Sequence, residues 1–223
     1  MPVSTTLASL AHTDVIISVL HTTVEATGNL AFALSGLLAG IRKRLDVVGL
    51  CVVTGLAAFG GGTLRDILLD RRPFFWVEHY NWLWIVIALS GAALLILRSR
   101  PIAFDERAIQ WPDALGLGLF CATGTQLGMD QHLPAIVAVL MGVFTAVFGG
   151  VLRDIVCNEI PTALRDRRPY AVCAFTGGWV YVLADSAQLS AGWSLLAAAA
   201  TATVLRCTAL LSGFELPTAD RED

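Results

Sequence analysis

Two Arg–Asp pairs follow glycine clusters in stretches that are otherwise apolar. The stretch AAFGGGTLRD carries Arg65 and Asp66, and the stretch TAVFGGVLRD carries Arg153 and Asp154. Ionisable side chains inside a membrane span are costly, and they usually face protein groups or a water-filled path. A carboxylate in such a path attracts cations, whereas an arginine repels them unless a carboxylate pairs with it. We therefore expect each arginine to pair with another helix; the alternative is that both extend to the membrane interface.

Glycines precede each pair, at Gly60–Gly62 and Gly149–Gly150. Each glycine in a helix costs about 1 kcal/mol relative to alanine, so we expect a kink or local unwinding at both clusters. The freed backbone groups would need partners in protein or along a water-filled path; the alternative is a tight helix crossing without water. The second cluster has Phe148 where the first has Gly60, so Phe148 is either a hydrophobic constriction or a packing residue.

Both motifs belong to an internal repeat. Shifting the chain by 88 residues aligns about a dozen identical residues over about fifty positions, which predicts a duplicated structural unit. The identities outside the Arg–Asp motif include Gly28 with Gly116, Phe32 with Phe120, Gly36 with Gly124, Gly40 with Gly128 and Pro73 with Pro161. Each copy holds three apolar spans, and an odd number inserts the second copy upside down, as an inverted repeat.

Other charged residues also lie in the predicted spans. Glu25 and Asp113 are equivalent in the two copies. Asp113 follows Pro112 at an expected helix start, where capping explains it at least as well as an ion contact. Glu25 lies deeper in its apolar run and is a candidate pathway residue. Arg206, in the last span, is expected to extend to the cytoplasmic interface. Polar positions that could line a wet path are Ser35, Thr54, Thr123 and Gln126.

The composition predicts an all-α membrane protein. Hydrophobic residues make up 56% of the chain and charged residues 15%, against about 25% charged in soluble domains. Seven apolar stretches are long enough, or nearly so, to span a membrane: 15–40, 46–69, 81–99, 112–128, 134–157, 169–186 and 192–212. The prolines near these stretches are expected at span ends, not inside them. Residues 1–223 thus form one transmembrane domain, with repeat one at about 15–99, repeat two at about 112–186 and a seventh helix at about 192–212.

Basic residues predict the orientation. The connections after the first, third and fifth spans share one side and carry most of them: Arg42, Lys43, Arg44, Arg98, Arg100, Arg107, Arg165, Arg167 and Arg168. The opposite connections carry only Arg71 and Arg72. Basic loops usually face the cytoplasm, so the N-terminus is expected outside the plasma (inner) membrane and the C-terminus in the cytoplasm.

Several function classes lack support in the sequence. The five cysteines are scattered singly and form no cluster with histidine, so no metal site is expected. No nucleophile–base pair or phosphate-binding loop appears, so we expect neither an enzyme nor a cofactor. No basic patch with interleaved aromatics is present, and nucleic acid is not an expected partner. Membrane lipids are expected to surround the protein.

The motifs GGGTLRD and GGVLRDIVCNEIP, with FALSG, FCATG and LPT, resemble the bacterial branch of the trimeric intracellular cation (TRIC) channels over about residues 20–218. The resemblance implies a homotrimer with one pore per protomer. It implies that spans two and five bend at their glycines and form much of that pore. It also implies permeation of monovalent cations, K⁺ and Na⁺, with weak selectivity. The basic lipid-binding motif of the animal members has no convincing counterpart here.

Two functions therefore compete. In the first, a passive cation channel, glycine bends open an aqueous path that Glu25, Asp66 and Asp154 make favourable for cations. In the second, a secondary transporter carries glycine or another small zwitterion, since inverted repeats and broken helices suit that function as well. Unitary currents in planar bilayers would separate the two.

Overall fold

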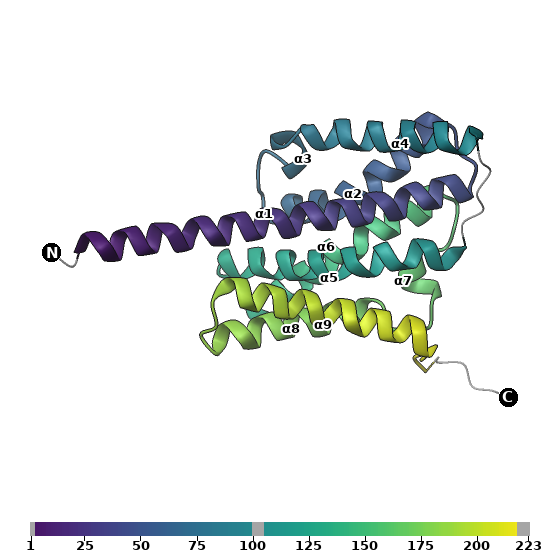
Figure 1. Cartoon of the computed structure of the whole chain (residues 1–223). Helices are drawn as coiled ribbons and strands as arrows, with labels where there is room; N and C mark the ends of the chain where they lie inside the picture. Colours follow the sequence, from purple (N-terminus) through teal and green to yellow (C-terminus); the bar gives the residue numbers. More distant parts are fainter. Residues whose placement is uncertain (1–2, 100–104, 218–223) are drawn as a thin grey trace.

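A computed structural model describes the backbone of residues 3–99 and 105–217 and the side chains of 19–96 and 105–217. This part of the chain holds nine helices and no strand. In chain order they are α1 (Val3–Arg42), α2 (Val47–Leu68), α3 (Phe75–Glu78), α4 (Asn81–Ser99), α5 (Glu106–Asp130), α6 (Ala135–Val156), α7 (Thr162–Arg165), α8 (Ala171–Ser186) and α9 (Ala191–Ser212). The long helices follow the predicted spans in order, and the two short ones, α3 and α7, were not expected (Figure 1). Residues 1, 2, 100–104 and 218–223, and the side chain of Arg98, lie outside the described part.

Four described helical segments are long and apolar enough to cross a membrane: Val19–Arg42, Val47–Leu68, Ala135–Val156 and Ala191–Ser212. Asn81–Ile96 is a shorter apolar segment. The helix α8 has 16 residues, which is shorter than the roughly 20 that a typical hydrocarbon core requires. The described helices therefore support a membrane protein, and the count of seven spans stays a prediction.

The start of α5 differs from the expectation. The helix begins at Glu106, where the Asp105 side chain accepts a 2.7 Å hydrogen bond from the Glu106 N–H. Pro112 therefore lies inside the helix and not at its end. The expectation of capping by Asp113 is wrong for the same reason, because Asp105 already supplies the cap. The segment ERAIQW, which precedes the predicted fourth span, forms the first turns of this helix.

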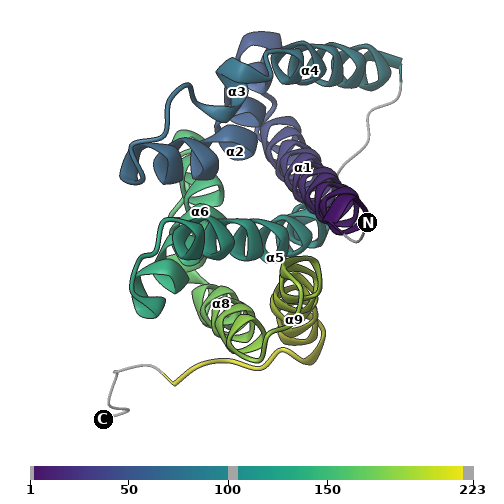
Figure 2. The same ribbon diagram turned by 90° about the vertical axis from the view of Figure 1, so that its left-hand side faces the viewer.

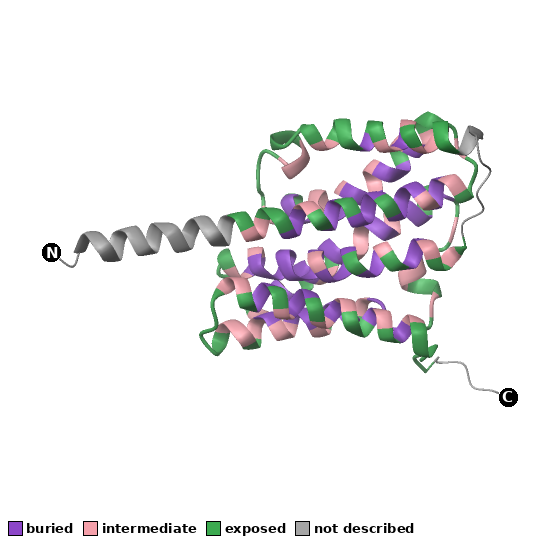
Figure 3. Ribbon diagram, viewed as in Figure 1, coloured by how far each residue is buried: buried purple, intermediate pink, exposed green. Residues whose placement is uncertain are grey.

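Helix α5 lies at the centre of the bundle. It packs against α1, α6, α8 and α9, and α2 packs against α1 and α6 (Figures 1 and 2). Buried residues concentrate where these helices meet, whereas α4 lies at the edge and is largely exposed (Figure 3). The N-terminal end of α1 and the C-terminal end of α9 lie at opposite ends of the bundle (Figure 1).

The contact between α1 and α5 is reciprocal. A Cβ atom on Gly28 would lie 2.7 Å from the Phe120 ring, and one on Gly116 would lie 2.7 Å from the Phe32 ring. The centroids of the two rings are 5.1 Å apart. Since Gly116 and Phe120 are the repeat equivalents of Gly28 and Phe32, each helix offers a ring to the glycine of the other.

The crossing of α2 and α6 is reciprocal too. A Cβ on Gly61 would overlap the Thr145 carbonyl oxygen, and a Cβ on Gly149 would overlap the Ala57 carbonyl oxygen. Thr145 and Gly149 lie 88 residues after Ala57 and Gly61. Both helices remain helical through their glycines, so the expected local unwinding is wrong, and the expected kink stays a prediction. At these two positions the glycines let the backbones touch.

Candidate functional site

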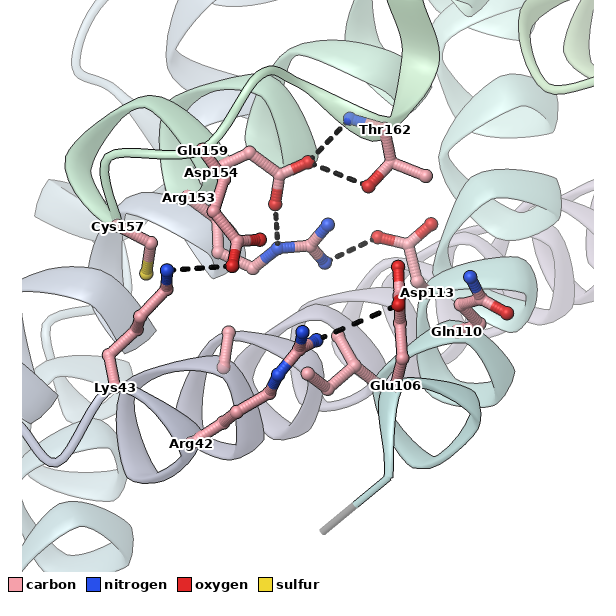
Figure 4. A pocket seen from close by; sticks show the side chains of 12 residues that line it. Arg42, Lys43, Glu106, Gln110, Asp113, Arg153, Asp154, Cys157, Glu159 and Thr162 are labelled. Carbon is pink, nitrogen blue, oxygen red and sulfur yellow. Dashed lines mark hydrogen bonds and ion pairs between the residues drawn. The ribbon is translucent and has the colours of Figure 1, made fainter. Parts of the chain in front are cut away.

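Arg153 on α6 is buried in a group of charged and polar side chains, here called the Arg153 network: Arg153, Asp113, Asp154, Ser35 and Thr162. The Arg153 Nε atom donates a 2.8 Å bond to Asp154 Oδ1, and its Nη1 atom donates a 2.6 Å bond to Asp113 Oδ1 on α5. The same Nη1 atom donates to the hydroxyl of Ser35 on α1, which in turn donates to the Ile109 carbonyl oxygen. The guanidinium thus joins three helices. Figure 4 shows its bonds to Asp154 and Asp113.

The Arg65 network (Arg65, Glu25, Asp66 and the Phe75 N–H) repeats this arrangement on α2. The Arg65 Nε atom donates to Asp66 Oδ1 at 2.9 Å, and Nη1 donates to Glu25 Oε1 on α1 at 2.9 Å. Arg65 is 1% exposed and Arg153 is 3% exposed. Each arginine therefore pairs with another helix, as expected, and also with its own neighbour in sequence. The alternative that they extend to the membrane interface is wrong.

Each aspartate of the two motifs has a second task. Asp66 Oδ2 accepts from the Phe75 N–H at 3.1 Å, and Asp154 Oδ2 accepts from the Thr162 N–H at 2.7 Å and its hydroxyl at 2.9 Å. Phe75 begins α3 and Thr162 begins α7. One carboxylate therefore orients the arginine with one oxygen and holds the start of a short helix with the other.

The glycine after each crossing lies beside the guanidinium. A Cβ on Gly62 would lie 3.9 Å from Arg65 Nη2, and one on Gly150 would lie 3.6 Å from Arg153 Nη2, both ordinary contact distances. The Cβ on Gly150 would also lie 3.2 Å from the Tyr170 hydroxyl and 3.3 Å from Asp113 Oδ1, which are tighter contacts. The close crossing therefore requires glycine at Gly61 and Gly149, whereas Gly62 has space for a side chain.

A cavity of about 20 Å³ reaches the Arg153 network from the end of the bundle at which α1 ends (Figure 4). This volume holds roughly one water molecule. Ion pairs surround its mouth: Lys43 with Glu159 at 2.7 Å, Arg165 with Glu106 at 3.0 Å and Arg42 with Glu106 at 4.0 Å. Basic residues from the connections after the first and fifth predicted spans therefore meet at one end of the bundle.

Arg206 on α9 is 1% exposed, so the expectation that it extends to the interface is wrong. It donates to Asp166 Oδ2 at 3.1 Å and to the Pro169 carbonyl at 2.9 Å, and it lies 4.8 Å above the Tyr170 ring. Asp166 lies between α7 and α8. Burial raises the pKa of Asp166, but hydrogen bonds from Arg168 and Arg206 outweigh burial and lower it. From its buried position Arg206 thus stabilises the connection between α7 and α8.

Gly60 and Phe148 lie on another face of the α2–α6 crossing. Both line an apolar groove of about 480 Å³, which Trp76 and Leu152 also line. Phe148 is half-buried there. A Cβ on Gly60 would lie 2.7 Å from Leu152 Cδ1. Whether Phe148 constricts an ion path stays a prediction.

The two networks lie far apart along α1. Glu25 serves one and Ser35 the other, and ten residues of helix span about 15 Å. Asn29 lies between them and is 2% exposed, and the expected polar positions Thr54 and Thr123 are fully buried. Among the described side chains, no group of three or more His, Cys, Asp and Glu residues could hold a metal ion.

Sequence reasoning missed several members of these groups. Thr162, Lys43 and Tyr170 join the site through loops or helix ends, where the repeat alignment is weak. The one available signal is the match of Pro161 with Pro73. Pro161 directly precedes α7, and Pro73 lies two residues before α3. Ser35 was expected only as a polar position.

Comparisons with known proteins fit this arrangement. A family model described as "Glycine transporter" matches residues 22–100 and 110–186. A "UPF0126 membrane protein" of Vibrio cholerae is 32% identical over 87% of this chain and 81% of its own length. The "UPF0126 inner membrane protein YadS" of Escherichia coli is 34% identical over 72% of this chain and 77% of its own length.

Solved structures identify the fold. The chain matches the TRIC trimeric intracellular cation channel orthologue from Rhodobacter sphaeroides with a TM-score of 0.80 and 31% identity, over 87% of this chain and 98% of that one. It matches a structure titled "Structural basis for conductance through TRIC cation channels" with a TM-score of 0.77 and 30% identity, over 91% of this chain and 98% of that one. The fold is that of helical membrane proteins of the ion-channel class. Within that class, the chain belongs to the bacterial branch of the TRIC family.

Proposed function

We propose that the protein is a homotrimeric channel for monovalent cations, K⁺ and Na⁺, with one path in each protomer between α1, α2, α5 and α6. One observation carries the proposal: each buried arginine is matched by two carboxylates. Arg65 pairs with Glu25 and Asp66, and Arg153 pairs with Asp113 and Asp154. Among these buried side chains each group therefore has one more carboxylate than arginine, which favours a cation over an anion. Arg71, whose side chain is 42% exposed and lies 3.9 Å from Asp66, offsets part of this charge at the Arg65 end.

The path is proposed to run between two inverted copies of a three-helix unit, with α9 outside the duplication. The reciprocal contacts support this. Gly28 meets Phe120 as Gly116 meets Phe32, and Gly61 meets Thr145 as Gly149 meets Ala57. A two-fold axis exchanges partners in this manner. Such an axis would set the two arginine networks at opposite ends of the path.

The α2–α6 crossing is the proposed gate. In this conformation the backbones touch at Gly61 and Gly149, and no path for an ion passes between them there. Conduction would need the two helices to separate at this point. Because each arginine is paired with two carboxylates, the remaining negative charge of each group would attract cations.

The proposed assembly and orientation rest on the relatives and on the basic residues. A solved relative is titled a trimeric channel, which supports a homotrimer surrounded by membrane lipids. A relative is named an inner membrane protein. Arg42, Lys43 and Arg165 meet at one end of the bundle, and we place this end and the C-terminus in the cytoplasm.

Recordings in planar bilayers with ion substitution test the function. We expect unitary K⁺ and Na⁺ currents with weak selectivity between the two. Gly61→Ala puts a methyl group against the Thr145 carbonyl, so it should disfavour the closed crossing and raise the open probability. Gly55→Ala is the matched control on the same helix, because its Cβ would have only one neighbour within 4 Å, at 4.0 Å from Phe59. Equal currents in both variants would contradict the gate.

The transporter alternative has its own signature. Saturable, coupled uptake of glycine into proteoliposomes, without unitary currents in bilayers, would replace the channel proposal. The description of the matching family model names such a substrate. The structure adds no observation that favours it, and its excess negative charge at both networks favours simple cations.

A further inference from the structure

The Arg65 network has a histidine that the Arg153 network lacks. His21 lies one helical turn before Glu25, and its Nδ1 atom is 3.9 Å from Glu25 Oε2. The equivalent residue in the second copy, one turn before Asp113, is Ile109. Imidazole is the side chain whose ordinary pKa lies nearest neutrality. The histidine therefore introduces a titratable group at one end of the proposed path only.

The His21 ring has unused hydrogen-bonding capacity. Its Nε2 atom and the Gln126 Oε1 atom are buried and, within the described part of the chain, have no hydrogen-bond partner. Both residues line one small cavity between α1, α5 and α9. Gln126 Oε1 and Glu25 Oε2 are both acceptors. A neutral imidazole has one N–H, whereas the imidazolium has two and could serve both acceptors after the ring and the Gln126 amide turn toward each other.

The charges that face His21 come from its own helix and two other parts of the chain. Burial of the ring opposes the imidazolium, as do Arg65 on α2 and Arg71 just after it, whereas Glu25 on α1 and Asp130 at the end of α5 favour it. The residues of α9 that line the cavity are Ala191, Gly192 and Leu195, which carry no charge. The side chain of His21 is 22% exposed, so protons can reach it from solution.

We propose that His21 is a proton-binding site that lowers cation conduction from one side of the membrane. A proton there adds one positive charge beside Glu25, the carboxylate that also holds Arg65. The group of Arg65, Glu25 and Asp66 then no longer has excess negative charge. The effect on conduction rests on the proposed cation path, whereas the binding of the proton does not.

The test is one-sided acidification of channels in planar bilayers. Lowering the pH from about 7.5 to about 5.5 titrates an ordinary histidine. One added charge near the mouth should reduce K⁺ current roughly two- to fourfold. Acidifying one side should have this effect and acidifying the other should not. His21→Ile, which copies the residue of the second repeat, should abolish the response, and His132→Gln and His79→Gln should retain it.

A second measurement separates this proposal from the channel proposal. In ¹⁵N-histidine-labelled protein, the His21 ring signals, assigned by their loss in His21→Ile, should change as the pH falls and the ring binds a proton. Gln126→Leu removes the second acceptor and should move this titration to lower pH. Wild-type currents that ignore acid on both sides, or a His21 ring that does not titrate, would overturn the proposal. Absent currents with a titrating ring would overturn only the channel.

Discussion

The Arg65 and Arg153 networks share the same bonds, but the additional groups around the two arginines differ. Both arginines bond to the adjacent aspartate and to a carboxylate on the preceding long helix, which is α1 for Arg65 and α5 for Arg153. Arg153 also bonds to Ser35 of the other repeat, and Tyr170, beneath Arg206, lies beside it. Around Arg65 the additional groups are His21 and Arg71. The duplicated motif thus sets the bonds that the two ends share, and unduplicated residues make the ends different.

The largest difference should appear when each arginine is removed. Arg153→Met leaves Asp113 and Asp154 buried without a cation, which should cost about 3–5 kcal/mol of unfolding free energy. Arg65→Met should cost less, because Arg71 lies 3.9 Å from Asp66 and is available to offset its charge. Unfolding of detergent-solubilised protein would measure both. Adding Asp113→Asn to Arg153→Met should recover part of the loss, and equal losses at the two arginines would contradict the comparison.

Arg206 should matter only at the Arg153 end. Arg206→Met removes charged hydrogen bonds to Asp166 and the Pro169 carbonyl, at about 1.5–3 kcal/mol per bond to a charged group. The pKa of Asp166 is lowered in the folded protein. Its stabilisation is therefore present above the unfolded pKa of about 3.9 and is lost as the pH falls through the lower folded pKa.

The difference between wild type and Arg206→Met should accordingly narrow in acid. Thermal unfolding at a series of pH values would measure it. Arg167→Gln is the control, because Arg167 is exposed and its nearest carboxylate, on Glu215, is 3.9 Å away. A difference that is independent of pH would show that Asp166 is not the partner that matters.

The reciprocal ring contacts should be equal, unlike the networks. Gly28→Ala overpacks the Phe120 ring and Gly116→Ala overpacks the Phe32 ring, at about 1–3 kcal/mol each. Phe120→Leu should couple to Gly28→Ala, and Phe32→Leu to Gly116→Ala, by about 0.5 kcal/mol or more. Double-mutant cycles would measure this. Coupling in the crossed combinations instead would contradict the two-fold relation.

The smallest effect should come from the surface ion pair at the cavity mouth. Lys43 and Glu159 are 2.7 Å apart, but their side chains are 33% and 26% exposed. Partly exposed pairs contribute about 0–1 kcal/mol, so Lys43→Gln should change the unfolding free energy by less than about 1 kcal/mol. A loss as large as that of Arg153→Met would show that the mouth, and not the buried network, holds this end together.

The sequence predicted the part of the site that the duplication marks. The 88-residue shift picked out Arg65, Asp66, Arg153, Asp154 and Glu25, and the structure gathers each arginine with its carboxylates. Hydropathy placed the long helices because apolar spans carry a strong signal. It misplaced the start of α5, because ERAIQW is polar and helical at once.

The role of the glycines was harder to predict. Glycine lowers helix propensity and also permits close contact, and propensity alone cannot decide between the two. At Gly61 and Gly149 the partner is a carbonyl oxygen on another helix, which no local pattern reveals. Arg206 was misjudged similarly, since its partners Asp166 and Pro169 belong to a connection whose path depends on the whole fold.

Asp66 and Asp154 connect the buried arginines to the two short helices, α3 and α7, whose first residues bond to these carboxylates. Nearly every bond of the Arg65 group stays within the first half of the chain, and Ser35 alone ties the Arg153 group to the other half. A disturbance that frees α3 would thus reach Arg65 through a single shared carboxylate, and one that frees α7 would reach Arg153 in the same manner. The two arginines can thereby be disturbed from different ends of the bundle, while the α1–α5 and α2–α6 contacts hold the two copies together.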